Sequence, residues 1–415
     1  SSNVAIGYNA MVTNTTGATN TAIGNESLYS NTTGASNVAV GNQALDANTT
    51  GGNNIAIGDN ALTSNTTNTT NIAIGASALA ANNAAGDNIG IGQQAAAANL
   101  SGYHLTSIGH YSLLANTSAQ GNTAVGHSSL RTTTTGAANT AVGKQTLCKN
   151  TTGGNNTALG YAALCLNTTG TENVAVGYDA LVKNTTGGEN VVVGVGAGGS
   201  ITTSAENTAV GSKALFTHQG TYGCNTATGF NAMRLTTTGY MNAAHGWRSL
   251  YNTTTGGCNA AIGFKAGFNL TTGGNNVLLG PIAGTDAVAN VTSGNHQIVI
   301  GNNDNQNAFI KIDWTVTSDL RDKTEIKNVT HGLDFVNQIT PIEYRFKKSR
   351  ENDTPTGNKK YGFKAQEILE LEGDNPIIVN NDDTDNLKLT SAYLVPVLVN
   401  AIKELKAEIE LLKNK

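Results

Sequence analysis

A short pattern of apolar and polar positions repeats along the first three quarters of this 415-residue chain. Each unit holds an asparagine, three residues with a small one in the middle, a glycine, an Ala-Leu pair and a polar Asn-Thr-Thr-Gly stretch, as in residues 37–51. The alternation of small and branched residues over three positions predicts a very short β-strand. The glycines recur every 17 residues, with one step of 18 and one of 21: Gly7, Gly24, Gly41, Gly58, Gly75, Gly92, Gly109, Gly126, Gly143, Gly160, Gly177, Gly194, Gly211, Gly229, Gly246, Gly263, Gly280 and Gly301.

The fixed period predicts a parallel β-solenoid, in which each coil buries its apolar face against its neighbours. Coils stacked at the ~4.8 Å spacing of strands would form a rod of roughly 80–90 Å. Sixteen of the eighteen units carry the asparagine, so these amides would form a hydrogen-bonded ladder along the rod. Leucines four residues after the glycines would form an apolar column. A helical repeat is a poor alternative because Gly, Asn and Thr are weak helix formers.

Composition alone would also fit a disordered chain, because the sequence is rich in Gly, Asn and Thr. The fixed spacing argues against disorder, since a disordered chain needs no register. An interior of Ala and Leu buries little apolar area, so a single rod would be marginally stable. We therefore expect several rods to associate side by side.

The density of charged residues changes near Thr317. Residues 1–317 carry 20 charged side chains and residues 318–415 carry 32, although the second stretch is a third as long. We predict a β-solenoid shaft over 1–301, a strand-rich closing segment over 302–317 and a small α+β domain over 318–415.

The clearest helix is expected over about 390–414, at the end of the second domain. Its apolar residues follow the 3, 4, 3, 4, 3 spacing of a coiled-coil seam: Val395, Leu398, Ile402, Leu405, Ile409 and Leu412. One interpretation is an amphipathic helix packed on its own domain. The other, which we favour, is a helix that associates with copies of itself.

A charged motif lies at the boundary in composition and consists of Ser318, Asp319, Arg321 and Lys323. Three further blocks follow in order, over residues 332–346, 361–367 and 394–412. With these blocks, the last 98 residues resemble the self-cleaving intramolecular chaperone domain at the C-terminus of phage tail fibres and tail spikes. Without them, the motif would be interpreted as a solvated turn.

The resemblance implies that the domain trimerises, aligns three chains and then cuts the Thr317–Ser318 bond. Ser318 would be the nucleophile and Lys323 its general base, with Asp319 and Arg321 in support. A hydroxyl needs such a base, and a lysine can serve only when it is neutral. One cut per chain suffices, so we expect at most a single-turnover serine–lysine endopeptidase. The expected trimer contacts are Leu398, Ile402, Leu405, Ile409 and Leu412.

The shaft resembles, more loosely, the left-handed parallel β-rolls in the heads of trimeric autotransporter adhesins. The resemblance rests on the repeated Asn-x-Ala-x-Gly unit. It implies the architecture and no particular ligand.

Three aromatic residues take the same position in consecutive coils: Phe230, Trp247 and Phe264. In a chain with only 5% aromatic residues, this stripe could be a binding platform for a receptor or saccharide, but a packing seam between rods is favoured. Cys148 and Cys165 would also stack one coil apart. We expect free thiols there, with a disulfide as the alternative.

Several functions and ligands are not expected. A net charge of −4 without a basic patch argues against nucleic acid. The chain has no apolar stretch of about 20 residues, so no membrane insertion is expected. His110 and His127 would stack without a matching carboxylate, so a surface ladder is favoured over a metal site. We expect neither a metal nor a cofactor.

These features together predict a homotrimeric adhesive fibre, most simply a phage tail fibre that binds a host receptor or glycan. Because the chain begins inside a repeat, we expect an upstream module that attaches it to a virion or filament. An alternative is an adhesive filament of a bacterial surface or giant-virus capsid. A glycan-degrading tail spike is disfavoured, because only eleven acidic residues are spread through 1–317.

Overall fold

The computed structural model describes residues 2–286, 289–305, 318–382 and 384–414. It divides into two compact units, Ser1–Asn302 and Asn303–Lys415, which are described separately. Residues 306–317 lie outside the described residues, so the strand-rich closing segment and Thr317 stay predictions.

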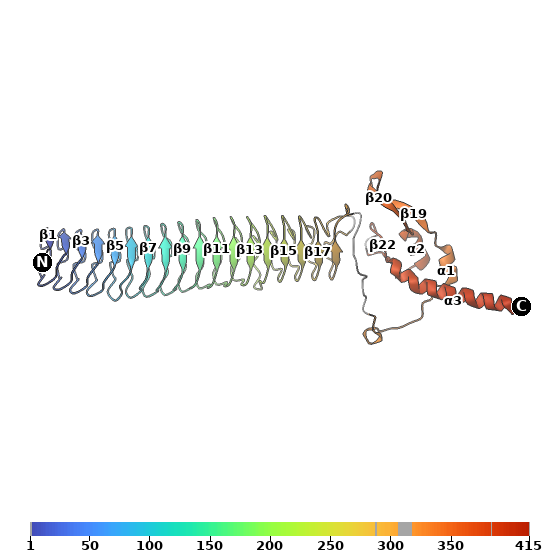
Figure 1. The fold of residues 1–415 in the computed structure, drawn as a ribbon, viewed down its shortest axis with the longest axis horizontal. Helices are drawn as coiled ribbons and strands as arrows, with labels where there is room; N and C mark the ends of the chain where they lie inside the picture. Colours follow the sequence, from blue (N-terminus) through green and yellow to red (C-terminus); the bar gives the residue numbers. More distant parts are fainter. Residues whose placement is uncertain (1, 287–288, 306–317, 383, 415) are drawn as a thin grey trace. The chain divides into compact units, whose positions relative to one another are not determined.

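The first unit is the predicted parallel β-solenoid (Figure 1). Every strand has three residues and pairs in register with the strand of the next coil, so that Ala22 lies opposite Ala39 and Ala39 opposite Ala56. The strands are β1 (Val4–Ile6), β2 (Thr21–Ile23), β3 (Val38–Val40), β4 (Ile55–Ile57), β5 (Ile72–Ile74), β6 (Ile89–Ile91), β7 (Thr106–Ile108), β8 (Thr123–Val125), β9 (Thr140–Val142), β10 (Thr157–Leu159), β11 (Val174–Val176), β12 (Val191–Val193), β13 (Thr208–Val210), β14 (Thr226–Thr228), β15 (Ala243–His245), β16 (Ala260–Ile262), β17 (Val277–Leu279) and β18 (Ile298–Ile300).

The interior of the solenoid is narrow and apolar. The middle residue of each strand from β2 to β18 is buried, and in most coils it is alanine. The leucine four residues after the glycine is fully buried wherever it occurs from Leu28 to Leu250. The two flanking strand positions point outward, because successive side chains of a strand alternate between its faces.

The asparagine before each strand is a structural element of the coil. Asn37 donates from Nδ2 to the carbonyl of Gly51 at 2.9 Å, and its Oδ1 accepts from the backbone N–H of Asn54 at 3.0 Å. The same pair of bonds recurs coil after coil. Each buried amide therefore joins two successive coils, and its polar atoms are satisfied at little cost.

The periodic glycine is required by its conformation and by its neighbour. Gly41 has a φ of +138°, which L-residues rarely adopt. A Cβ placed on it would lie 2.4 Å from the carbonyl oxygen of Gly58 in the next coil. No side chain fits between adjacent coils at this point, which explains why the period is marked by glycine.

Several non-glycine residues of each coil also have a left-handed backbone. Gln43, Leu45 and Asn53 have φ values of 54°, 56° and 59°. Their N–H groups bond along the rod instead of within the turn; that of Leu45, for example, donates to Ala61 at 2.9 Å. Bonds between coils thus stabilise a conformation that costs about 1 kcal/mol or more per residue locally.

The second unit is a small α+β domain that ends in the predicted helix. Its elements are η1 (Leu320–Asp322), α1 (Leu333–Gln338), β19 (Ile342–Ser349), β20 (Asn352–Gly362), α2 (Ala365–Glu372), β21 (Val379–Asn380), β22 (Lys388–Leu389), η2 (Ser391–Tyr393) and α3 (Leu394–Lys413). Strands β19 and β20 form an antiparallel hairpin, as do β21 and β22. The fully or nearly buried core consists of Phe335, Ile368, Ile378, Val379, Leu394 and Val397.

The fold class is confirmed: a β-solenoid precedes a small α+β unit with a terminal helix. Helix α3 begins at Leu394, a few residues later than expected, because the chain first makes the short 3-10 turn η2. Among the described helices, none is both long and apolar enough to cross a membrane.

Candidate self-cleavage site

The motif at the start of the chaperone-like region is folded around one short turn. Asp319 caps η1, and its Oδ1 accepts from the backbone N–H of Arg321 at 2.9 Å. The turn ends at Lys323, whose N–H donates to the carbonyl of Leu320 at 3.2 Å. This turn brings the lysine side chain back to the start of the motif.

The structure brings the two predicted catalytic side chains together. Nζ of Lys323 donates to Oγ of Ser318 at 2.8 Å and to the carbonyl oxygen of Ser318 at 3.1 Å. Both residues are exposed. A nucleophile and a base must lie within about 2.6–3.2 Å of each other, and this pair meets that requirement in a single chain.

The other two charged residues of the motif pair with each other. Arg321 donates to both carboxylate oxygens of Asp319, from Nη2 at 2.6 Å and from Nε at 3.0 and 3.1 Å. These bonds hold the pKa of Asp319 below its usual value, and they raise the pKa of Arg321. Arg321 is therefore directed at Asp319, and its charge is largely neutralised before it can act on Lys323.

The chain after the motif is tied to helix α3. The carboxylate of Glu404 accepts from the N–H of Leu333 at 2.6 Å, and Asn400 donates to the carbonyl of His331 at 3.0 Å. A Cβ on Gly332 would lie 2.2 Å from the Glu404 carboxylate, so the backbone and this side chain approach each other closely. Sequence analysis assigned Glu404 and Asn400 no role, although Glu404 belongs to one of the matching blocks.

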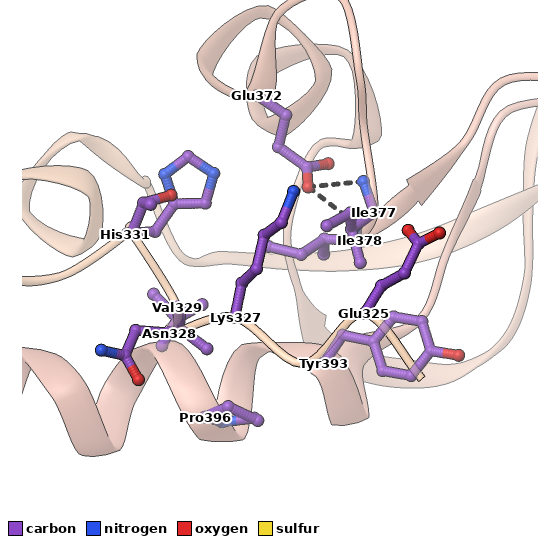
Figure 2. A pocket seen from close by; sticks show the side chains of 12 residues that line it. Glu325, Lys327, Asn328, Val329, His331, Glu372, Ile377, Ile378, Tyr393 and Pro396 are labelled. Atoms are coloured by element: carbon purple, nitrogen blue, oxygen red, sulfur yellow. Dashed lines mark hydrogen bonds between the residues drawn. The ribbon is translucent and has the colours of Figure 1, made fainter. Parts of the chain in front are cut away.

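A groove of about 560 Å³ lies beside this connection (Figure 2). Residues 325–331 form one wall, while Glu372, Ile377, Tyr393 and Pro396 contribute to the rest. Glu372 faces the groove, yet its carboxylate already accepts from the N–H groups of Ile377, Ile378 and Val379. This carboxylate fastens the chain after α2 and is not a free acid.

The comparison with protein families identifies this region. Residues 318–374 match the family described as chaperone of endosialidase, and the match begins at Ser318. This match covers 57 of the 415 residues and lies within the C-terminal unit. With its long solenoid, the protein is tail fibre-like and carries a C-terminal chaperone domain, as the resemblance predicted. No curated protein and no solved structure matches the chain.

The predicted trimer contacts lie on helix α3, and all of them are exposed to solvent in the single chain. The seam residues of α3 are between 42% and 70% exposed: Val395, Leu398, Ile402, Leu405, Ile409 and Leu412. The buried residues of the helix are three others, Leu394, Val397 and Ala401. Helix α3 therefore uses one apolar face within the domain and leaves the seam uncovered in the single chain.

The predicted aromatic stripe is stacked along the solenoid. The ring centroids of Phe230 and Trp247 are 6.4 Å apart, and those of Trp247 and Phe264 are 4.9 Å apart. The rings are within 14° of parallel. Phe230 and Phe264 are exposed, whereas Trp247 is half-buried.

The other stacked pairs lie as expected one coil apart. Cys148 and Cys165 are free thiols. A hydrogen bond from Cys165 lowers the pKa of Cys148 to about 6, although burial opposes the shift. The rings of His110 and His127 are 6.0 Å apart. Within the described residues, no group of three or more His, Cys, Asp or Glu side chains is placed to hold a metal.

Sequence analysis also missed a second ladder. The asparagine of the Asn-Thr-Thr-Gly stretch was assigned to a polar loop, but it is fully buried, and Asn48 donates to Asn31 Oδ1 at 2.9 Å. The ladder is interrupted where the next coil lacks asparagine, and there Oδ1 of Asn116 and of Asn184 has no hydrogen-bond partner. The regular recurrence of this asparagine was the signal that could have revealed it.

Proposed function

We propose that three copies of this chain form an extracellular adhesive fibre, most simply a phage tail fibre that attaches to a host. In this proposal the chaperone domain drives trimer assembly and then releases itself by cutting the Thr317–Ser318 bond. The observation that carries the proposal is the uncovered apolar seam of α3, in a domain that matches the chaperone-of-endosialidase family.

The seam favours self-association over packing within one domain. A helix packed only on its own domain would expose polar residues on its far side. Here six residues at coiled-coil spacing are exposed, although three other apolar residues already bury the helix against the core. Three such seams would cover one another in a parallel bundle.

The solenoid carries a second uncovered surface that runs its whole length. The third residue of every strand faces outward and is Ile, Val or Leu in all coils except those of Thr228 and His245. Several members of this stripe are exposed, Ile6, Leu159 and Ile262 among them. An apolar stripe that is interrupted at only two coils, on a rod with a thin core, is suited to lateral packing of rods. It supports a trimer of shafts ahead of the trimer of helices.

The cleavage chemistry follows from the position of the dyad. Neutral Lys323 would take the proton of the Ser318 hydroxyl while Oγ bonds to the carbonyl carbon of Thr317. The proton would then pass to the leaving nitrogen of Ser318, so that the peptide bond becomes an ester. Water would hydrolyse that ester and free the Thr317 carboxylate. The nucleophile is adjacent to its own target, so effective concentration replaces a substrate pocket.

Assembly would supply what the single chain lacks. A lysine becomes a base when burial or positive charge favours its neutral form. In one chain Lys323 is exposed and Arg321 is engaged by Asp319. We infer that packing of three domains buries the dyad, so that cleavage follows trimer formation.

The cleavage is tested by expressing the wild type beside Ser318→Ala and Lys323→Arg. We expect the wild type to release a C-terminal fragment of 98 residues on a denaturing gel. Both variants should stay full length, since arginine keeps the charge but does not become neutral. Cleavage of Ser318→Ala at the same bond would disprove the dyad.

Assembly is tested separately by removing residues 318–415. We expect the shaft alone to be insoluble or misaligned, because its stripe would lack a device that sets three chains in register. A soluble, well-folded trimeric shaft without the domain would contradict the chaperone role.

A further inference from the structure

The coils around the aromatic stripe carry a cluster of cations as well as rings. We call it the cation–aromatic patch and define it as Arg234, Trp247, Arg248, Tyr251, Phe264 and Lys265. All six lie on coils 14 to 16 of the solenoid, which the in-register strands β14, β15 and β16 stack directly on one another.

Most ring faces of the patch are covered by other rings of the solenoid. Trp247 is stacked between Phe230 and Phe264, with interplanar angles of 14° and 7°. Tyr251 is stacked on Phe268 in a parallel column, with centroids 5.2 Å apart. Since the ring faces meet each other along the rod, a sugar ring or a nucleic-acid base cannot stack between them.

The rings instead hold the cations in place. The guanidinium carbon of Arg248 lies 4.3 Å from the Trp247 ring centroid and 5.3 Å from that of Tyr251. Nζ of Lys265 lies 5.6 Å from both Trp247 and Phe264. Arg234 donates from Nη1 to the hydroxyl of Tyr251 at 2.9 Å. Cation–π contacts of this kind restrict long side chains that would otherwise move freely.

These cations have no acidic partner. Residues 207–285 contain no Asp or Glu, although they contain Lys213, Arg234, Arg248 and Lys265. Every ion pair among the described residues is formed by side chains of the C-terminal unit, within residues 319–410. Nε of Arg234 and of Arg248 is buried and has no hydrogen-bond partner in the described structure. The patch is therefore basic on a chain whose net charge is −4.

At one position of the coil, cations occur only in this part of the solenoid. The position two residues after the periodic glycine holds Lys213, Arg248 and Lys265 in three of four successive coils. In earlier coils the same position is neutral or acidic, as with Glu26, Gln43 and Asp179. The repeat alone does not require cations there, since the neutral residues fold into the same coil.

We infer that the cation–aromatic patch binds an acidic polysaccharide, whose carboxylates pair with Arg248, Lys265 and Arg234. The inference rests on the proposed adhesive function and names the chemical class of the receptor. Guanidinium groups suit planar carboxylates, and groups held in place lose little entropy on binding. A repeating polyanion also suits cations that are presented one coil apart. Nucleic acid is disfavoured because single-strand binders stack bases on free ring faces, which are mostly covered in this patch.

The test uses the full chain and immobilised polygalacturonate, with dextran as the neutral polysaccharide and single-stranded DNA as the competing polyanion. We expect salt-sensitive binding to polygalacturonate and little binding to dextran. Arg248→Gln with Lys265→Gln should weaken binding by about ten-fold or more, since two charge-assisted bonds are lost. Arg248→Lys should keep more of the affinity than Arg248→Gln.

Lys144→Gln is the matched control. Lys144 lies 5.9 Å from the Tyr161 ring, which is stacked on Tyr178, so it reproduces one cation over one aromatic pair outside the patch. We expect its affinity to stay within about two-fold of wild type. Light scattering on each variant shows whether a loss of binding is caused by a loss of assembly. If the double variant loses its oligomeric state, the patch is a packing seam and the inference is overturned.

Further outcomes distinguish a failure of this inference from a failure of the proposed adhesive function. Attachment to host cells without binding to polygalacturonate, or equal binding to DNA, would reject the acidic polysaccharide and leave adhesion standing. Failure of the folded, oligomeric protein to attach to any tested cell would reject the adhesive function itself.

Discussion

The two units of this protein are stabilised in different ways. In the solenoid, each coil repeats the same bonds to the coil before and after it, and buried amides such as Asn139 connect them. In the C-terminal unit, a small core centred on Phe335 and Ile368 holds short elements together, and the terminal helix leaves an apolar seam exposed. The first unit specifies its own stacking, and the second is suited to specify how many chains assemble.

This difference shows which unit can determine how the chains align with one another. A repeat in which every coil is alike permits neighbouring rods to slip by whole coils, because each slip restores equivalent contacts. A domain that occurs once in each chain cannot slip in this way, because a shifted alignment would not restore its contacts. In the proposed trimer, a contact at this place would set the register of a long shaft.

The largest expected effect is on the seam of α3. Ile409→Glu would place three carboxylates in one apolar contact, so we expect trimers to be lost while each solenoid keeps its fold. Leu411→Glu is the matched control, because Leu411 is also exposed and apolar but lies outside the seam. Size-exclusion chromatography with light scattering measures both variants. A trimeric Ile409→Glu protein would show that the seam is not the trimer contact.

The next effect is within a single coil. Gly126→Ala would place a Cβ 2.5 Å from the Gly143 carbonyl at a φ of +129°, so we expect a loss of more than about 4 kcal/mol. Gly121→Ala should cost only about 1 kcal/mol, because its φ is +66° and the added Cβ meets nothing within 4 Å. Ala138 already takes the equivalent position in the next coil at φ 56°. Thermal unfolding, monitored by circular dichroism, compares the stabilities of the two variants.

A smaller effect is expected from one buried amide. Asn139→Ala leaves the Asn156 N–H without its partner and removes one of the two amides that donate to the Gly153 carbonyl, and we expect a loss of about 2–3 kcal/mol. Asn42 belongs to an exposed ladder, where Asn25 donates to it at 2.8 Å. Asn42→Ala should change the unfolding free energy by less than about 0.5 kcal/mol, because water replaces the lost bond. Equal losses at the two sites would contradict the role assigned to burial.

The smallest effect is a dependence on pH. His218 takes the place of the ladder asparagine in one coil, where it is fully buried and contacts Ser204 Oγ at 3.1 Å. Burial lowers its pKa, so the unfolded chain binds a proton at a higher pH than the folded chain does. Stability should be full above about pH 6.5 and should decrease as the pH falls toward the folded pKa.

His218→Asn is the matched variant for that dependence, because it places there the uncharged amide that earlier coils carry at this position, as with Asn167 and Asn184. Its melting temperature should change less between pH 7.5 and 5 than that of the wild type. A wild-type melting temperature that is constant over this range would refute the assignment to His218.

Much of the architecture could be predicted from the chain. The period of 17, the small residue in the middle of each strand and the spacing of the terminal helix left few alternatives. The second asparagine ladder escaped prediction because Asn-Thr-Thr-Gly is also typical turn chemistry. Its burial depends on the coil above, which local sequence does not describe.

The candidate cleavage site also has features that the sequence predicts and features that it does not. The spacing of Ser318 and Lys323, together with the blocks that follow, was enough to nominate the dyad. The bonds from Glu404 and Asn400 to residues 331–333 were not predictable, since the partners come from different elements and lie about 70 residues apart in the chain.

By itself, then, the sequence determined the number of coils, their register and the position of the chaperone domain, because a strict repeat of short strands stacks in only one way. Only the tertiary structure decided the conformation within each coil. Leucine at a φ near +50° opposes its local preference, and it is held there by hydrogen bonds to coils that lie 17 residues away in sequence. The same holds for the cation–aromatic patch, whose charges gather because three coils stack.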